Sequence, residues 1–165
     1  MFLESLSLHN FRNITQLELM IPAQGVLLQG SNGAGKTNIL EALYLCTTGR
    51  SFRTQHIHEM IRYGESCARV SARFIRGGVR HVIDVTLQPQ HRVITVDDKR
   101  LQVTSSLLQM VNVVVFFPDD LRIAKGSAEG RRHFVDRMVA NIQPDFLTSS
   151  INYGKVLKSR NQVLR

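Results

Sequence analysis

Apolar and polar residues alternate in the first part of the chain, as they do in β-strands that bury one face. Leu6 and Leu8 alternate with polar residues, and a second alternating run covers 16–21. The sequence therefore predicts two strands, with a turn over 22–25 after the second. The short apolar run that follows predicts a buried strand over 26–29, which glycines then end.

The pattern changes to helical spacing over residues 36 to about 47. Ile39, Leu40, Leu43 and either Cys46 or Thr47 share one side of this predicted helix, and we expect that side to be buried. Gly49 follows the last helical residue, where a glycine commonly ends a helix because it adopts positive φ without strain.

The middle of the chain predicts a loop and a short helix over 50–66, followed by antiparallel strands over 68–103. The pair Gly77–Gly78 is typical of a two-residue hairpin turn. Residues 111–117 are almost all apolar and end at Pro118, which predicts another buried strand.

The last part of the chain is predicted to be helical from Ser127 onward. Pro144 interrupts this pattern, so a second helix is expected over 145–164. That second helix is polar with few apolar residues, and it needs a partner or projects from the body. The first helix carries an apolar stripe formed by Phe134, Val135, Met138, Val139 and Ile142.

A glycine-rich loop between the predicted strand at 26–29 and the helix after it matches GxxxxGK[ST] at every fixed position. Glycines let successive backbone N–H groups face a phosphate chain, and the helix N-terminus adds partial positive charge. We expect Lys36 to reach the β- and γ-phosphates and Thr37 to offer its hydroxyl to Mg²⁺. The predicted nucleotide-binding residues are Gly30, Ser31, Asn32, Gly33, Ala34, Gly35, Lys36 and Thr37.

This loop predicts ATP (or GTP) binding but leaves the function open. A transporter ATPase, a metabolic kinase and a DNA-repair ATPase all place such a loop between a strand and a helix.

Composition narrows the class of protein. With 43% hydrophobic residues, the 165-residue chain can build a core. Its apolar runs fall far short of the roughly 18 residues that cross a bilayer. Its start has no basic segment followed by an apolar one, as a secretory signal would have. Cys46 and Cys67 are not spaced as metal ligands, which favours free thiols and a cytoplasmic protein away from membranes.

The net charge of +8 is unevenly distributed. Residues 1–48 hold 2 basic and 3 acidic residues, whereas 49–100 hold 10 basic and 5 acidic, and 101–165 hold 9 basic and 5 acidic. Arginine supplies 16 of the 21 basic residues, and a guanidinium suits phosphate contacts. Nucleic acid is therefore a plausible partner, although many cytoplasmic proteins are simply basic.

Several segments together resemble the RecF family of SMC- and ABC-type ATPase heads. The resemblance covers the whole chain, and it rests on NFRN at 10–13, GSNGAGKTNILEALY at 30–44, GRSFR at 49–53, FPDDL at 117–121, RRHFVD at 131–136 and LKSRN at 157–161. It implies an α/β fold: a P-loop NTPase core, a flanking antiparallel β subdomain and the start of a helical arm. Residues 1–125 would form the ATP-binding lobe and 126–165 the start of the arm lobe.

The same resemblance implies an ATP-dependent DNA-binding protein of recombinational repair, replication and the SOS response to DNA damage. ATP with Mg²⁺ would switch DNA binding and head dimerisation. The partners would be gapped or junction DNA, RecR- and RecO-like proteins and a second copy of the chain. Arg12 would contact the nucleotide phosphates, and Arg50 and Arg53 would contact DNA phosphates. Each could equally be a solvated surface arginine, as could Arg69, Arg73 and Arg80 on the predicted sheet.

The chain departs from the family pattern in having neither an LSGGQ-like signature loop nor a clear Walker B strand. Asp119 and Asp120 follow an apolar run, but Pro118 intervenes, so their role stays open. We expect little ATP turnover from these residues alone. Two other classes remain, the ATPase of an ABC transporter and a small P-loop kinase. The NFRN and GRSFR segments argue against the first, and the antiparallel block at 68–103 against the second.

Overall fold

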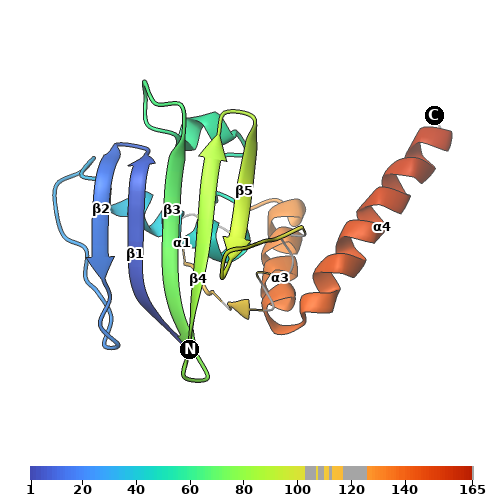
Figure 1. Ribbon diagram of the computed structural model, residues 1–165. Helices are drawn as coiled ribbons and strands as arrows, with labels where there is room; N and C mark the ends of the chain where they lie inside the picture. The colour runs from blue at the N-terminus through green and yellow to red at the C-terminus, as the bar shows by residue number, and fades with distance from the viewer. Residues whose placement is uncertain (103–106, 108–109, 112, 117–125, 165) are drawn as a thin grey trace. The chain divides into compact units, whose positions relative to one another are not determined.

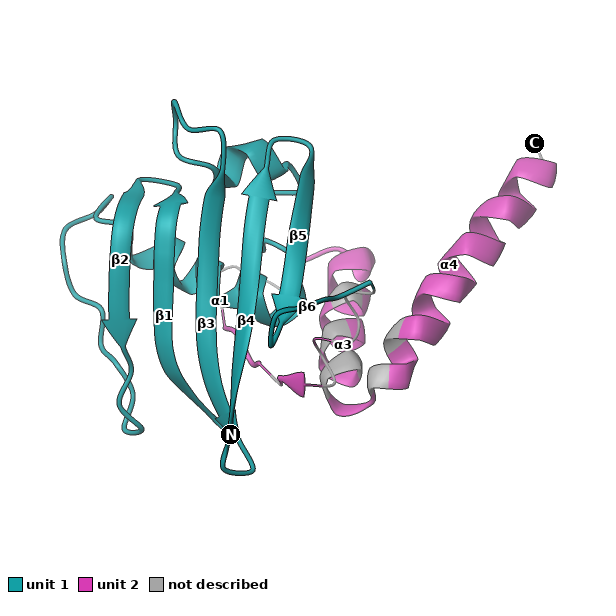
Figure 2. Cartoon of the chain, viewed as in Figure 1, with its two compact units in different colours: residues 1–104 teal, residues 105–165 magenta. Residues whose placement is uncertain are grey.

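The structure is a computed structural model, and it describes residues 1–102, 107, 110–111, 113–116 and 126–164. The chain divides into two compact units, residues 1–104 and 105–165 (Figure 2). The lobe boundary predicted at residue 125 lies outside the described residues.

Unit 1 is built on one antiparallel sheet of six strands in the order β2-β1-β3-β4-β5-β6. The strands are β1 (Phe2–Phe11), β2 (Ile14–Met20), β3 (Ala68–Arg76), β4 (Val79–Gln88), β5 (His91–Val96) and β6 (Lys99–Arg100). Helix α1 (Lys36–Thr48) lies against one face of the sheet, where it contacts β1, β3 and β4 (Figure 1). A short 3₁₀ helix, η1 (Ile57–Met60), contacts β4.

The core lies between this face of the sheet and α1. Alternation places Leu8 and Val70 opposite each other on neighbouring strands, with Val85 opposite Val70 on the next strand. All three side chains are at most 1% exposed. Full burial of a side chain of this size contributes about 1.5–3 kcal/mol, so this row of strand residues holds the sheet to the helix.

The predicted hairpin at 77–78 is confirmed. Gly77 and Gly78 have φ values of 57° and 79°, and Arg76 pairs with Val79 on either side of them. Two consecutive positive φ values define the tight turn that matches the twist of antiparallel strands. Gly49 likewise ends α1 with a φ of 70°, as predicted.

The predicted buried side of α1 is confirmed at Cys46 and Thr47 but is wrong at Leu40. Leu40 is 50% exposed, whereas Ala42, Leu45 and Cys46 are fully buried. The sheet covers the side of the helix that also carries Glu41, an acidic residue that a hydrophobic pattern assigns to the solvent face.

The strand predicted over 26–29 is absent from the described part of the chain, and Leu27 is 81% exposed. An apolar run forms a buried strand only when neighbouring strands bond its backbone and its faces are covered. In the described sheet, this run has no such neighbour. The strand predicted over 111–117 includes residues 112 and 117, which lie outside the described residues, so it stays a prediction.

The described residues of unit 2 include the helices α3 (Ala128–Ile142) and α4 (Pro144–Val163), which contact each other. Ser127 caps α3, since its hydroxyl accepts a hydrogen bond from the backbone N–H of Gly130 at 3.1 Å. Pro144 begins α4, where its missing N–H costs nothing. The predicted helices and the break between them are thus confirmed. Among the described helices, none is both long and apolar enough to span a membrane.

The two cysteines differ sharply in access to solvent. Cys46 is fully buried, and burial together with the charge of Asp84 raises the pKa of its thiol. Cys67 is exposed. Because the thiolate is the reactive form, iodoacetamide at neutral pH should alkylate Cys67 alone in the folded protein and both cysteines in denaturant. Peptide mass spectrometry gives the pattern, with Cys67→Ser as the control, and native labelling of Cys46 at a comparable rate would contradict the burial.

Candidate functional site

The glycine-rich loop leads directly into α1 in a conformation that only glycine adopts easily. Gly33 and Gly35 have φ values of 84° and 96°, in the left-handed region. A Cβ added to Gly35 would lie 3.0 Å from the side-chain oxygen of Asn13. The loop therefore needs glycine at residue 35 for both its backbone angle and its close contact with the end of β1.

Lys36 lies across this loop. Its ammonium group donates hydrogen bonds to the carbonyl oxygens of Gly30 and Ser31, both at 2.8 Å. Thr37 follows and is exposed. The first turn of α1 carries no acidic residue and no side-chain cap, so its N-terminal partial charge is uncompensated by the described side chains. The residues predicted to bind nucleotide are thus brought together in one loop whose donors suit a phosphate chain.

Next to the loop, one buried carboxylate gathers three side chains. Glu41 on α1 is fully buried, and it accepts hydrogen bonds from Arg12 Nε at 3.0 Å and Arg12 Nη2 at 2.6 Å. Ser51 Oγ donates to it at 2.5 Å, and Arg53 Nη1 lies 3.3 Å from its Oε2. We call Arg12, Glu41, Ser51 and Arg53 the Glu41 cluster. A buried charge is tolerated only when it is paired and hydrogen-bonded, and Glu41 is both.

The backbone at the end of β1 presents Arg12 to this cluster. Arg12 has a φ of 55°, its N–H donates to the carbonyl of Met60 at 2.8 Å, and its Nη1 donates to the carbonyl of Glu59 at 2.6 Å. All three guanidinium nitrogens of Arg12 are therefore bonded within the protein. Arg12 was predicted to contact nucleotide phosphates; that role stays a prediction, and its side chain is here directed at Glu41.

A chain of amide side chains links the cluster to the glycine-rich loop. Asn13 Nδ2 donates to the carbonyl of Gly33 at 2.8 Å, and Asn38 Nδ2 donates to Asn13 Oδ1 at 2.8 Å. Arg53 Nη1 donates to Asn38 Oδ1 at 2.7 Å. The loop at 49–53 is thus connected through side chains to the backbone of the glycine-rich loop.

Sequence reasoning missed Asn13, Asn38, Glu41 and Ser51 as members of this arrangement, although all four lie within the segments that carried the family resemblance. An acidic residue at helical spacing from buried Ala42 and Leu45 was the available signal for Glu41. Of the predicted DNA-contacting residues, Arg53 belongs to the Glu41 cluster, whereas Arg50 is exposed, and no described carboxylate pairs with it. Asp119 and Asp120 lie outside the described residues.

Two of the arginines on the outer face of the sheet are neutralised. Arg69 pairs with Asp84 at 3.0 Å, and Arg80 forms two hydrogen bonds to Glu4 at 2.7 and 2.8 Å. Arg73 is exposed and has no hydrogen-bonded carboxylate among the described residues. Arg69 and Arg80 therefore contribute little free positive charge to this face.

Comparisons with known proteins identify the family. Residues 5–146 match a family model described as an AAA domain. The chain is 41% identical over all 165 residues to the DNA replication and repair protein RecF of Myxococcus xanthus, and 36% identical to that of Clostridioides difficile. It spans 43% and 44% of those proteins, so it covers less than half the length of the curated relatives it matches.

Solved structures agree. The chain superimposes with a TM-score of 0.86 on the recombination mediator protein RecF-ATPrS in the RecFOR pathway, at 27% identity, over 99% of this chain and 44% of that one. An SMC ATPase chain matches with a TM-score of 0.67 at 22% identity, over 83% of this chain and 99% of that one, which supports the fold alone. The predicted fold class, with an ATPase core, an antiparallel sheet and helices, is confirmed. The chain therefore belongs to the AAA domain family, and its relatives are RecF proteins.

Proposed function

We propose that this chain forms the ATP-binding part of a RecF-like protein that binds DNA in recombinational repair and replication, with ATP acting as a switch. The relatives are named as DNA replication and repair proteins, and two of the solved relatives are RecF-ATPrS and RecF-ATP. The observation that carries the proposal is the hydrogen-bonded path from Gly33 through Asn13 and Asn38 to Arg53. It joins the phosphate-binding loop to an arginine-bearing surface loop.

In this proposal, Lys36 and the first-turn amides of α1 hold the β- and γ-phosphates of ATP. The hydroxyl of Thr37 holds Mg²⁺, and the bound ion neutralises phosphate charge. The three glycines of the loop at 30–35 leave room for the phosphates because they carry no side chains. These roles fit the donor geometry of the loop described above.

The switch acts through the Glu41 cluster. Asn38 lies one turn into the helix that begins at Lys36, and it accepts a hydrogen bond from Arg53. A ligand that favours one arrangement of the helix start therefore also favours one arrangement of the 49–53 loop. Arg50 and Arg53 on this loop contact DNA phosphates in the proposal, and such contacts position DNA without reading its sequence.

The intact protein would act as an ATP-dependent dimer on gapped or junction DNA in the cytoplasm, together with RecO- and RecR-like partners. The solved SMC ATPase that shares this fold comes from a study of ATP-driven dimerisation and DNA-stimulated activation of SMC ATPases. The transporter and kinase alternatives are not favoured, since the curated relatives share one DNA-repair name.

We expect Arg50→Ala to weaken DNA binding of the intact, ATP-bound protein. Each phosphate contact releases counterions, so the slope of log affinity against log salt should fall by about 0.9 for one lost contact on duplex DNA. ATP affinity should be unchanged, because Arg50 bonds to none of the nucleotide-loop residues. Arg53→Ala should flatten the slope similarly and also alter ATP affinity through Asn38. Replacing both arginines should flatten the slope by up to about 2 units.

Fluorescence anisotropy on two duplexes of unrelated sequence, with and without ATP, gives these slopes. Arg73→Ala is the matched control, since it removes one exposed arginine from the opposite face of the sheet. If the Arg50 and Arg53 variants keep the wild-type slope of log affinity against log salt, the DNA-binding surface lies elsewhere on the protein. DNA affinity that is equal with and without ATP rules out the switch.

A further inference from the structure

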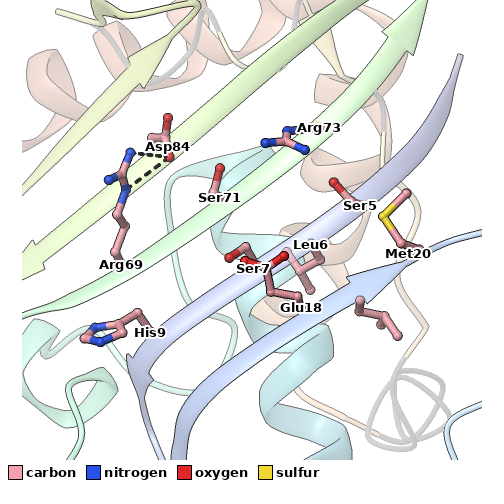
Figure 3. Close-up of a pocket in the computed structure, with 11 residues that line it drawn as sticks. Ser5, Leu6, Ser7, His9, Glu18, Met20, Arg69, Ser71, Arg73 and Asp84 are labelled. Carbon is pink, nitrogen blue, oxygen red and sulfur yellow. Dashed lines mark hydrogen bonds and ion pairs between the residues drawn. The ribbon is translucent and has the colours of Figure 1, made fainter.

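Two surface hollows among the described residues of unit 1 differ in charge. The first, of about 240 Å³, lies on the outer face of the sheet over β1, β2, β3 and β4 (Figure 3). It contains Arg69 and Arg73 but also Glu18 and Asp84, and Figure 3 shows Arg69 directed at Asp84. Positive and negative side chains therefore balance within this hollow, which makes it a poor site for an anion.

The second hollow, of about 320 Å³, lies beside the β5–β6 hairpin, at the edge of the sheet opposite to β2. The polar residues that line it are Arg92, Arg100 and Gln102, and its remaining lining comes from Ile57 and from apolar residues of the hairpin. Arg100 pairs with Thr95, so it reaches the hollow from the face of the hairpin opposite to that of Arg92. No acidic residue is among the described residues that line it. Two guanidinium groups and an amide supply up to about twelve N–H groups, all of which are donors suited to phosphate oxygens.

The position of Arg92 is unusual for an arginine. It pairs directly with Leu87 of β4, and residues opposite each other on neighbouring strands share a face. Leu87 is fully buried, so Arg92 lies on the face that α1 covers. Partial burial, together with the charge of Arg50, lowers the pKa of the Arg92 guanidinium. No described carboxylate forms an ion pair with Arg92 or with Arg50. The two positive charges therefore repel each other.

An anion placed beside these side chains would supply the missing counter-charge. A cation that is partly removed from water gains more from a phosphate than one on an open surface, because the local dielectric is lower. The charge of Arg50 acts on Arg92, which indicates that the 49–53 loop lies near this hollow. That loop and this hairpin fall in the most basic third of the chain, where residues 49–100 hold 10 basic and 5 acidic residues.

We propose that the hollow beside the β5–β6 hairpin binds a backbone phosphate of DNA through Arg92, Arg100 and Gln102. This site extends the DNA contact from Arg50 toward the edge strand, and the inference rests on the proposed function. The contact is independent of base sequence, because the donors meet phosphate oxygens and not base edges. Ile57 from η1 forms the apolar wall of the site.

The test uses Arg92→Gln, Arg100→Gln and the double variant in the intact, ATP-bound protein. A salt titration on duplex DNA should show a slope lower by about 0.9 in each single variant and by up to about 1.8 in the double variant. Affinity at fixed salt should fall about tenfold in the double variant, equally on two unrelated sequences. Arg92→Lys keeps the charge, so it should keep the wild-type slope, and it guards against a result caused by misfolding.

Arg73→Gln is the matched control, because it removes one arginine from the mixed-charge hollow, and its slope should stay near that of the wild type. If Arg50→Ala flattens the slope and the double variant does not, the inference is overturned while the proposed function stands; an acidic protein surface then becomes the candidate ligand. If titrated inorganic phosphate binds equally well to wild type and double variant, the hollow is no phosphate site. If the wild type binds no DNA, both proposals fail together.

Discussion

Replacing Glu41 with alanine is expected to lower the free energy of unfolding by about 3–5 kcal/mol, more than any surface change in the chain. The carboxylate is fully buried and holds Arg12 by two hydrogen bonds at 2.6 and 3.0 Å. Arg12 has a side chain that is 17% exposed, so the variant would leave a largely desolvated guanidinium without its counter-ion. The contribution of Arg53 is smaller, about 0–1 kcal/mol, because its side chain is 45% exposed.

Further variants at Glu41 and Arg12 separate the contribution of the buried charges to stability from the contribution of side-chain packing. Glu41→Gln keeps an acceptor for one arginine nitrogen and should cost about 1–3 kcal/mol. The double variant Arg12→Met/Glu41→Leu removes both charges and should recover a large part of the loss, because apolar residues of similar size often replace a buried ion pair well. Glu18→Gln removes an exposed carboxylate and should stay within about 0.5 kcal/mol of wild type.

Urea unfolding followed by far-ultraviolet circular dichroism measures all four variants. A loss below about 1 kcal/mol in Glu41→Ala would mean that the pair contributes no more than a surface ion pair. A double variant less stable than Glu41→Ala would mean that Arg12 has a second stabilising role. Its hydrogen bond from Nη1 to the carbonyl of Glu59 is the candidate for that role.

The strands, the hairpin and the ends of the helices were predictable because their signals are local. Alternation around Leu6 and Leu8 specifies a strand with one buried face, and Gly77–Gly78 specifies the turn between β3 and β4. Gly49 and Pro144 fix helix boundaries through their own backbone preferences. These features need no knowledge of distant residues.

The Glu41 cluster was not predictable in the same way, because its members are far apart in the sequence. Arg12 lies 29 residues before Glu41, and it reaches the carboxylate from a backbone with positive φ, which arginine rarely adopts. The pattern on α1 indicated a buried side at Ile39, Leu40 and Leu43, since an acid is expected to face solvent. Tertiary pairing reversed that expectation and buried Glu41 instead.

The apolar run at 26–29 shows that a local pattern can also predict a strand that the structure does not form. The same residues fit a buried strand or an uncovered extended segment, and only neighbouring strands decide between the two. The glycine-rich loop that follows was correctly placed before α1, because its function depends on glycine angles and on the helix start. The chemistry of that loop was therefore predictable even where the strand before it was not.

Lys36→Ala should reduce ATP affinity at least about 30-fold while leaving the fold intact. Removing a charged partner from a phosphate contact costs about 2–5 kcal/mol, and about 1.4 kcal/mol corresponds to tenfold in affinity. The ammonium group donates at 2.8 Å to the carbonyls of Gly30 and Ser31, and both bonds are solvent-exposed, so the melting temperature should change little. Lys36→Arg keeps the charge on a larger, planar group and should restore only part of the affinity.

Binding of a fluorescent ATP analogue, measured beside thermal melting of the same samples, separates nucleotide binding from folding. Lys99→Ala is the matched control, because it removes one exposed lysine from β6, and its affinity should equal that of the wild type. An Lys36→Ala variant that is folded and binds the analogue with wild-type affinity would exclude the glycine-rich loop as the nucleotide site. It would also remove the first step of the proposed switch, since the path from Gly33 to Arg53 begins in that loop.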